Sequence, residues 1–266
     1  MNSKVNIKLK QALFIAPVLF MVYITSCKRK EDEIFRQDEK FSTYQWENHT
    51  DQKVFESPDS FTLPPSEIHQ FTLKSIDPKT RNQVKIKAAY FGNIINIAQD
   101  SLIVFCHGGQ NHMDYYYEQI KTLYQCGSIG KYGILLFDYQ GLGSSNGETS
   151  LDAITQDAAA VAHWLKEKSV PTKNITLYGQ GLGAVAACYL AANNEDDFDS
   201  PNNLILENPV ARADYLLSSA TQLNLPSSFI NQSNFDNIAL IKTFKGKLLM
   251  LVSKYDQKYD KTINGE

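Results

Sequence analysis

The chain has little of what several common protein functions require. Its 26 basic and 29 acidic residues leave a formal net charge of −3 without a basic stripe, which argues against nucleic acid as a partner. Its four cysteines have neither the spacing of a metal site nor that of a C-x-x-C redox pair. Internal repeats are lacking as well, which argues against a repeat architecture. The sequence therefore predicts one α/β domain with no metal and no cofactor.

A hydrophobic run long enough to cross a bilayer comfortably is also lacking at the N-terminal end. The apolar run Ala12–Ile24 has thirteen residues, whereas a spanning helix needs about 20. Three lysines lie among the ten residues before the run. A basic segment followed by a short apolar run is typical of a secretory signal peptide.

The end of this apolar run resembles the lipobox of bacterial lipoproteins. The residues are Ile24-Thr25-Ser26-Cys27, and in that family the cysteine carries the lipid and becomes the new N-terminus. The resemblance predicts a signal peptide over residues 1–26 and a lipid on Cys27. We therefore expect a protein of the bacterial cell envelope, held to a membrane by its lipid without spanning it. An uncleaved signal anchor is the alternative.

The next segment is expected to be a solvated tether. Charged residues dominate Lys28–Lys40, and such a composition is unable to bury a core. The prediction places a charged tether over residues 27–60 and lets Pro64-Pro65 mark the entrance of a domain over 61–266.

Within that domain the chain alternates between strands and helices. Two β-rich runs come first, and then strands and helices take turns, which predicts a mostly parallel sheet covered by helices on both faces. A polar stretch over 211–244 is long enough to hold a cap or lid. The expected strands are Ile68–Ile76, Val84–Phe91, Ser101–Cys106, Gly133–Phe137, Ile175–Tyr178, Asn203–Glu207 and Lys247–Val252, and the expected helices are Tyr115–Cys126, Leu151–Lys168 and Ala184–Ala192.

A glycine-rich turn follows the fifth of these strands. The residues Gly179-Gln180-Gly181-Leu182-Gly183 match the G-x-S-x-G nucleophile elbow except that glycine stands at the serine position. The same letters, extended to Ala184, also fit the dinucleotide fingerprint G-x-G-x-x-G/A, and the acidic Glu207 ends the next strand. A nucleotide-binding domain therefore stays open as a remote alternative.

Five segments together make the chain resemble the α/β-hydrolase superfamily, in its serine esterase, lipase and peptidase branches. Their order is the order of that family's motifs. The fold implied is the α/β-hydrolase fold, with the glycine turn as its elbow. In chain order the segments are Phe105–Gly109, Leu136–Gly143, Leu177–Ala184, Leu206–Pro209 and Leu251–Asp256.

The resemblance implies a role for four positions. Gly181 fills the nucleophile slot, where glycine offers no attacking atom, and Asp256 fills the slot of the acid. The backbone N–H groups of Gly109 and Leu182 take the place of the oxyanion donors. Such donors at the start of a helix would still bind a carbonyl or a small anion.

The histidine base has no counterpart in this order. In the family the histidine follows the acid, whereas all five histidines of this chain precede Gly181, and ten residues follow Asp256. The expectation is therefore a fold without its last helix, last strand and histidine loop. It leaves the strand Lys247–Val252 as an open edge that a protein partner would cover.

The other side chains that could act as nucleophile or base are expected to have structural roles. His107 is expected to organise its loop and His112 to begin a helix. Ser144 and Ser145 are turn residues. Cys106 is expected to be a buried thiol without a paired base.

These observations predict an envelope lipoprotein with a catalytically inactive α/β-hydrolase core and a binding or scaffolding role. The alternative is a serine hydrolase relative inactivated by truncation and by a Ser-to-Gly change, or one that uses an unorthodox nucleophile on esters or amides.

Overall fold

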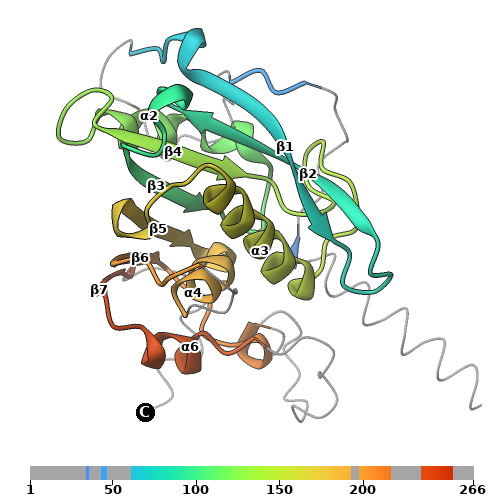
Figure 1. Ribbon diagram of the computed structural model, residues 1–266. Helices are drawn as coiled ribbons and strands as arrows, with labels where there is room; N and C mark the ends of the chain where they lie inside the picture. Colours follow the sequence, from blue (N-terminus) through green and yellow to red (C-terminus); the bar gives the residue numbers. More distant parts are fainter. Residues whose placement is uncertain (1–33, 36–42, 47–60, 193–197, 217–234, 254–266) are drawn as a thin grey trace, which may run out of the picture.

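A seven-stranded sheet forms the centre of the molecule (Figure 1). The computed structural model describes residues 34–35, 43–46, 61–192, 198–216 and 235–253. Within them the strand order is β1-β2-β4-β3-β5-β6-β7. The mostly parallel sheet with flanking helices confirms the expected α/β-hydrolase fold.

The first two strands form an antiparallel hairpin on one side of the sheet. β1 (Ile68–Ile76) pairs along its whole length with β2 (Gln83–Phe91), and β2 continues antiparallel onto β4. The turn between them is held by Asp77, whose side chain accepts the N–H groups of Lys79 and Thr80. Its side chain thus acts as a local backbone acceptor, as Asp often does in turns.

The other strands run parallel to one another. They are β3 (Ser101–Cys106), β4 (Tyr132–Phe137), β5 (Ile175–Gln180), β6 (Asn203–Glu207) and β7 (Lys247–Leu251). Their carboxyl ends consequently meet at one edge of the sheet, which is where open α/β sheets place their ligand sites. The loops after β3, β4, β5, β6 and β7 all begin there.

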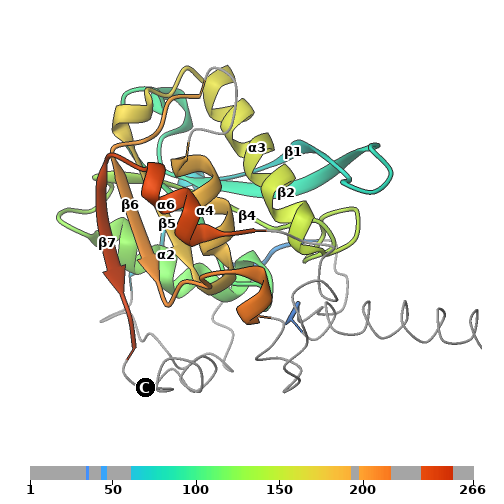
Figure 2. The ribbon, with the colours of Figure 1, turned by 90° about the horizontal axis from the view of Figure 1, so that it is seen from below.

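Helices cover both faces of the sheet (Figures 1 and 2). α2 (Tyr117–Gln125) lies on one face, and the other face carries α3 (Leu151–Glu167), α4 (Ala184–Ala191) and α6 (Asn237–Thr243). α3 begins at Ser150, whose hydroxyl accepts the Ala153 N–H, a standard helix N-cap.

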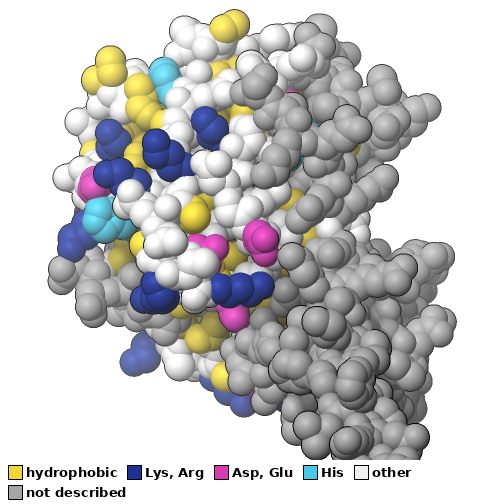
Figure 3. All heavy atoms as spheres, turned by 90° about the vertical axis from the view of Figure 1, so that its right-hand side faces the viewer, with side chains coloured by type: hydrophobic (Ala, Val, Ile, Leu, Met, Phe, Trp, Pro, Cys, Tyr) yellow, Lys and Arg dark blue, Asp and Glu magenta, His cyan; other side chains and the backbone are white. Residues whose placement is uncertain are grey.

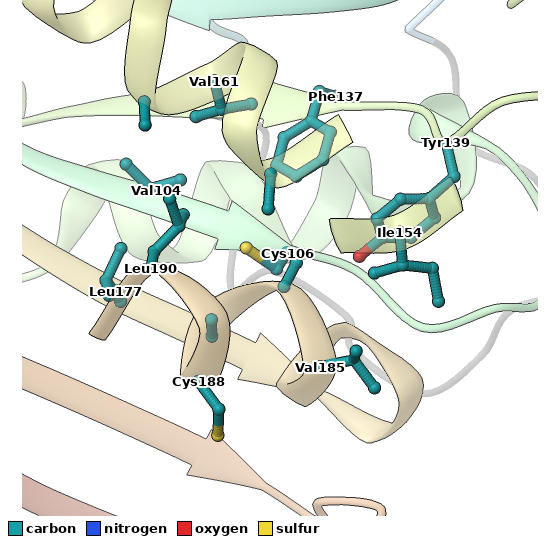
Figure 4. Packing of buried hydrophobic residues seen from close by; sticks show 14 of the residues in the cluster. Val104, Cys106, Phe137, Tyr139, Ile154, Val161, Leu177, Val185, Cys188 and Leu190 are labelled. Carbon is teal, nitrogen blue, oxygen red and sulfur yellow. The ribbon is translucent and has the colours of Figure 1, made fainter. Parts of the chain in front are cut away.

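The larger apolar core lies between the sheet and the helices α3 and α4 (Figure 4). Alternate residues of the strands point into it, because successive side chains of a strand face opposite ways. A second cluster fills the space beneath α2. Side chains labelled in Figure 4 come from strands (Val104, Cys106, Phe137, Leu177), from α3 (Ile154, Val161) and from α4 (Val185, Cys188, Leu190).

The stretch expected to hold a cap or lid contains a packing helix. Between β6 and β7, α6 packs against α4 and so covers the sheet as an ordinary crossover helix. Its N-cap is Asp236, which accepts the Ala239 N–H. Residues 217–234 of that stretch lie outside the described residues.

The described parts of the expected tether are buried in the domain. Phe35 is fully buried and Tyr44 is 5% exposed, so the prediction of a solvated segment over 27–60 is wrong at these positions. The composition rule failed because a few apolar side chains among many charges are enough to dock a segment onto an existing core. The domain therefore includes residues before 61.

The described surface mixes charges of both signs. Figure 3 shows basic, acidic and apolar side chains interspersed among the described residues on the side that faces right in Figure 1. Among the described residues, no helix is both long and apolar enough to cross a membrane.

Candidate functional site

The turn after β5 has the geometry of a nucleophile elbow. β5 ends at Gln180, Gly181–Gly183 form a single 3-10 turn, and α4 follows directly. Gly181 has φ +54°, which lies in the left-handed region that L-residues adopt at a cost. A strand that turns sharply into a helix through such a residue is the local structure of the G-x-S-x-G motif.

The three glycines of this turn have different surroundings. A Cβ at Gly179 would lie 2.7 Å from Ala184 Cα, and one at Gly183 would overlap the Cys106 carbonyl. These two positions therefore require glycine so that α4 can approach β5 and β3. At Gly181, by contrast, a Cβ would meet nothing within 4 Å. The apex of the turn is thus open to a side chain or to a ligand atom.

The loop after β3 lies against the first turn after the apex. A Cβ at Gly109 would come 2.5 Å from Leu182 Cδ2, so the structure brings together the two residues named as oxyanion donors. Both lie at the carboxyl edge of the sheet, and Leu182 directly follows Gly181. Two backbone N–H groups in such a place can stabilise an oxyanion or bind a carbonyl oxygen.

The loop after β6 connects the elbow to the end of β7. The Val210 N–H donates to the Gly181 carbonyl at 3.2 Å, and the Asn208 N–H donates to the Leu251 carbonyl at 2.8 Å. The Asn208 side chain in turn accepts the Ser253 N–H at 2.7 Å. Asn208 therefore holds the chain just after β7, the segment that leads toward Asp256, by two hydrogen bonds.

Two of the predicted site residues lie outside the described residues. They are Asp256, in the acid slot, and Cys27, the lipidation site. Asn208 was not singled out from the sequence as a site residue, although it belongs to a motif segment. Its φ of +43° is a conformation that Asn adopts more readily than most residues, and an Asn-Pro pair after a strand is the signal that could have indicated it.

His107 and Asp138 form a buried pair beside the elbow. His107 Nε2 lies 3.3 Å from Asp138 Oδ1, and both side chains are fully buried. The imidazole ring lies between the rings of Tyr116 and Tyr139, with centroids 4.8 and 4.9 Å away. This enclosure agrees with a histidine that organises its loop and leaves it no access to a substrate.

The Asp138 carboxylate is an acceptor shared by several segments. It accepts the Met113 N–H at 2.7 Å and the Tyr44 hydroxyl. Burial, followed by the negative charge of Asp138, raises the pKa of the Tyr44 phenol above its ordinary value. Tyr44 therefore stays protonated and donates to the carboxylate. Sequence reasoning missed Tyr44 because nothing in its local pattern indicates a partner 94 residues away.

The remaining candidate groups have structural roles. His112 precedes the 3-10 turn Met113–Tyr116 and is buried. The Ser145 hydroxyl accepts the Lys87 N–H, and the Ser144 N–H donates to the Tyr44 hydroxyl. These contacts are those of a helix start and a turn.

The buried thiols are unreactive. Burial raises the pKa of Cys106 above its ordinary value, and it raises the pKa of Cys188 to about 12. Because the thiolate is the nucleophilic form, neither residue supplies a nucleophile at neutral pH. The described cysteines Cys106, Cys126 and Cys188 are free, and only Cys126 is exposed.

Metal chemistry has no support in the described part of the chain. In those residues no group of three or more His, Cys, Asp or Glu side chains could hold an ion. The described site consists of the open apex at Gly181 and of Gly109 beside Leu182, at the carboxyl edge of a mostly parallel sheet. Together with the topology they define the class of α/β hydrolases.

Comparison with known proteins gives the family. The family model described as serine aminopeptidase, S33, matches residues 98–262. Because this match covers more than half of the chain, the chain belongs to that family. The match also favours the elbow over the dinucleotide fingerprint as the interpretation of the glycine turn.

Several individual proteins are similar to the chain. An uncharacterized protein, R595, of Acanthamoeba polyphaga mimivirus is 28% identical over 152 residues, covering 54% of this chain and 47% of the relative. Lysophosphatidylserine lipase ABHD12 of Danio rerio is 34% identical over 110 residues, covering 41% and 28%. The chain thus spans less than half the length of these relatives.

Among solved structures, the fold is similar to that of an α/β hydrolase from Vibrio vulnificus. The TM-score is 0.56 with 19% identity, over 73% of this chain and 66% of that one. An identity this low supports the fold alone. The site must therefore be interpreted from the residues of this chain.

Proposed function

We propose that this protein is an envelope-anchored lipoprotein whose hydrolase domain binds an acyl ester without forming an acyl-enzyme. The observation that carries the proposal is the apex of the elbow. Gly181 keeps the left-handed backbone and the open space of a nucleophile position but offers no atom that could attack. Covalent catalysis requires that atom, whereas recognition of a carbonyl requires only the donors beside it.

The neighbouring residues support a carbonyl or small anionic ligand. Gly109 and Leu182 lie together at the apex, on the loop after β3 and at the start of α4. Backbone N–H groups at the start of a helix favour partial or full negative charge. An ester carbonyl bound there would keep its acyl bond intact, because Gly181 cannot displace the leaving group.

The relatives suggest which ester to test first. Several matching proteins are named lysophosphatidylserine lipases, and such a lipid carries one acyl ester and an anionic head group. The ligand proposed for this chain is therefore a lysophospholipid of this kind, retained and not hydrolysed.

The first experiment treats the full-length protein with a fluorophosphonate probe. We expect no labelling of the native chain, together with saturable binding of lysophosphatidylserine and no release of fatty acid. Specific fluorophosphonate labelling or fatty acid release by the native chain would overturn the proposal. Absence of lipid binding would reduce it to a scaffolding role.

The alternative is a serine hydrolase relative in which Gly181 replaces the nucleophile. The open space at the apex favours it, because a serine side chain would meet no atom within 4 Å of its Cβ. The variant Gly181→Ser tests this alternative directly. A gain of fluorophosphonate labelling, absent from the matched Gly181→Ala chain, would show that the remaining machinery is in place.

The membrane anchor is tested separately. If Cys27 carries the lipid, the variant Cys27→Ala should leave the membrane fraction or accumulate with its signal peptide uncleaved. Cys126→Ser is the matched control, because it removes an exposed thiol elsewhere in the chain. Unchanged processing and membrane attachment of the Cys27→Ala chain would rule the anchor out.

A further inference from the structure

The loop after β3 is held by three side chains that each donate to one of its backbone carbonyl oxygens. The Tyr139 hydroxyl donates to the His107 carbonyl at 2.9 Å. The Tyr116 hydroxyl donates to the Gln110 carbonyl, also at 2.9 Å. Between them, His107 Nδ1 lies 2.6 Å from the Gly108 carbonyl oxygen. Because a carbonyl oxygen only accepts, Nδ1 is the donor of this bond. Side chains therefore set the backbone orientation of the loop.

The three donors form one stack of rings. The His107 imidazole lies between the rings of Tyr116 and Tyr139, with centroids 4.8 and 4.9 Å away. In Figure 4 the Tyr139 hydroxyl lies beside the end of β3. The other ring nitrogen of the imidazole, Nε2, lies 3.3 Å from Asp138 Oδ1. Packing on both sides and a contact at each nitrogen thus fix the plane and the direction of this ring.

The Gly108 carbonyl shares a peptide bond with the Gly109 N–H, one of the two expected oxyanion donors. The described residues contain no cis peptide bond, so the carbonyl and the N–H of this bond point in opposite directions. A side chain that fixes the direction of the Gly108 carbonyl therefore also fixes the direction of the Gly109 N–H. The same loop lies against the elbow, because a Cβ at Gly108 would be 3.8 Å from the Gln180 carbonyl oxygen.

We propose that His107 is a positioning residue for the ligand site. Its Nδ1–H holds the Gly108 carbonyl and thereby directs the Gly109 N–H toward the apex of the elbow. The proposal deepens the ligand-binding function proposed above and rests on it for the identity of the ligand. The direction of the donor is set before a ligand arrives, so a carbonyl can bind without reordering the loop. The buried imidazole acts through the backbone and does not touch the ligand.

The sequence allows this one peptide bond to be observed selectively. Gly108 and Gly109 are the only two consecutive glycines among the 14 glycines of the chain. In full-length protein grown with glycine that carries ¹³C at the carbonyl and ¹⁵N at the nitrogen, only the Gly109 nitrogen is bonded to a labelled carbonyl. An NMR spectrum that correlates each amide with the preceding carbonyl therefore shows one signal, which reports the Gly108 carbonyl and the Gly109 N–H.

Two variants that carry the same amide group separate the two contacts of the imidazole. The amide nitrogen in His107→Asn takes the position of Nδ1 and retains a donor to Gly108. The amide nitrogen in His107→Gln takes the position of Nε2 and retains a donor to Asp138 alone. We expect the Gly108 carbonyl signal to keep its position in His107→Asn and to move upfield in His107→Gln, where its hydrogen bond is lost. His163→Gln is the matched control, because it changes an exposed histidine of α3.

Titration with lysophosphatidylserine then measures the effect of the donor on binding. We expect the dissociation constant to rise about tenfold in His107→Gln, the effect of losing one hydrogen bond, and to stay near the native value in His107→Asn and His163→Gln. Equal affinity of the two His107 variants for a lipid that binds the native chain would overturn the positioning role.

The signal of the labelled peptide bond separates this role from the identity of the ligand. The same position of the Gly108 carbonyl signal in both His107 variants would overturn the positioning role, whether or not lysophosphatidylserine binds. An upfield signal in His107→Gln alone, without any lipid binding by the native chain, would support the positioning role and contradict the proposed ligand.

A measurement on the native chain tests the same bond if a variant does not fold. Glycine follows only one of the five histidines, so labelling the histidine carbonyl with ¹³C and glycine with ¹⁵N assigns His107. The ¹⁵N shifts of its ring show which nitrogen carries a proton. We expect a proton on Nδ1. A bare Nδ1 would overturn the proposal, because it could not donate to the Gly108 carbonyl.

Discussion

Gly181 and Gly183, two residues apart in one turn, favour glycine for different reasons. At Gly181 the reason is the backbone conformation, since φ is +54°, whereas the space around it is open. Gly183 has an ordinary helical backbone but would drive a Cβ into the Cys106 carbonyl. The first constraint concerns one dihedral angle, and the second concerns the contact between α4 and β3.

Alanine at each position should separate the two constraints. We expect Gly181→Ala to lower the free energy of unfolding by about 1–2 kcal/mol, the cost of a left-handed L-residue. Gly183→Ala should lower it by more than about 3 kcal/mol, because backbone must move to admit the methyl group. Urea unfolding followed by circular dichroism measures both changes. Equal losses would contradict this account of the elbow.

Asp157 is a buried carboxyl group that links three elements. On α3, it accepts the Ser75 hydroxyl at 2.6 Å and the Gln140 N–H at 2.8 Å. Burial nevertheless raises its pKa from 3.8 to about 6, because removing the charge from water outweighs these bonds. The group therefore favours the folded state in its protonated form.

This shift predicts that stability depends on pH. Because the folded pKa is the higher one, the contribution of Asp157 is fully present below pH 4 and is lost as the pH rises through 6. About 3 kcal/mol is the most that such a shift can contribute. Urea unfolding at pH 4.5 and 7.5 should show native stability falling with pH relative to Asp157→Asn, which cannot ionise. Parallel pH profiles of the two chains would refute the assignment.

At the scale of elements, β7 differs from the other strands. It is one of the two edge strands in the described part of the sheet, and unlike β1 at the other edge it has all five of its residues exposed. Leu249 and Met250 are each 51% exposed, and Val252 just beyond is 66% exposed. An apolar strand at the edge of a sheet is typical of sites that pair with another chain.

A charge on β7 should therefore reduce association between chains. We expect Leu249→Lys to lower the mean sedimentation coefficient at high protein concentration, toward the value of a single chain. Ile95→Lys is the matched control, because Ile95 is an exposed apolar residue (88%) outside the strands. Two results would contradict this prediction. One is a native protein that does not associate as its concentration rises, and the other is an equal effect of the two variants on association.

The sequence predicted the bounds of several strands and helices closely, because these elements carry strong local signals. β1 and β3 begin and end where the apolar runs do, and α3 differs from its expected range by one residue. The alternation of strands and helices along the sequence also predicted the mostly parallel sheet. The elbow was identifiable from its glycines, since close packing at Gly179 and Gly183 leaves no other choice of residue.

At the scale of the whole molecule, the sequence failed where partners lie far apart in the chain. No local pattern predicts the hydrogen bond between Tyr44 and Asp138 or the packing of the His107 ring against Tyr116 and Tyr139. The charged segment before the domain had a strong local pattern, but it indicated the wrong environment for Phe35. Composition averages over a segment, whereas docking depends on single side chains that find a pocket in a core formed elsewhere.

The boundary of the domain can be tested by where the chain is made to begin. A chain that begins at residue 34 keeps Phe35 and Tyr44, whereas one that begins at residue 47 loses both buried side chains. Burial of one large aromatic ring contributes about 2–3 kcal/mol. The free energy of unfolding of the shorter chain should therefore be lower by several kcal/mol, seen in urea unfolding as a lower midpoint.

The longer chain should match the stability of the full sequence if the preceding residues contribute no packing. Adding a peptide of residues 34–46 to the shorter chain should restore part of the loss, because the apolar clusters that bury Phe35 and Tyr44 remain. Equal stability of the two chains would indicate that the domain begins at residue 61, as the sequence predicted.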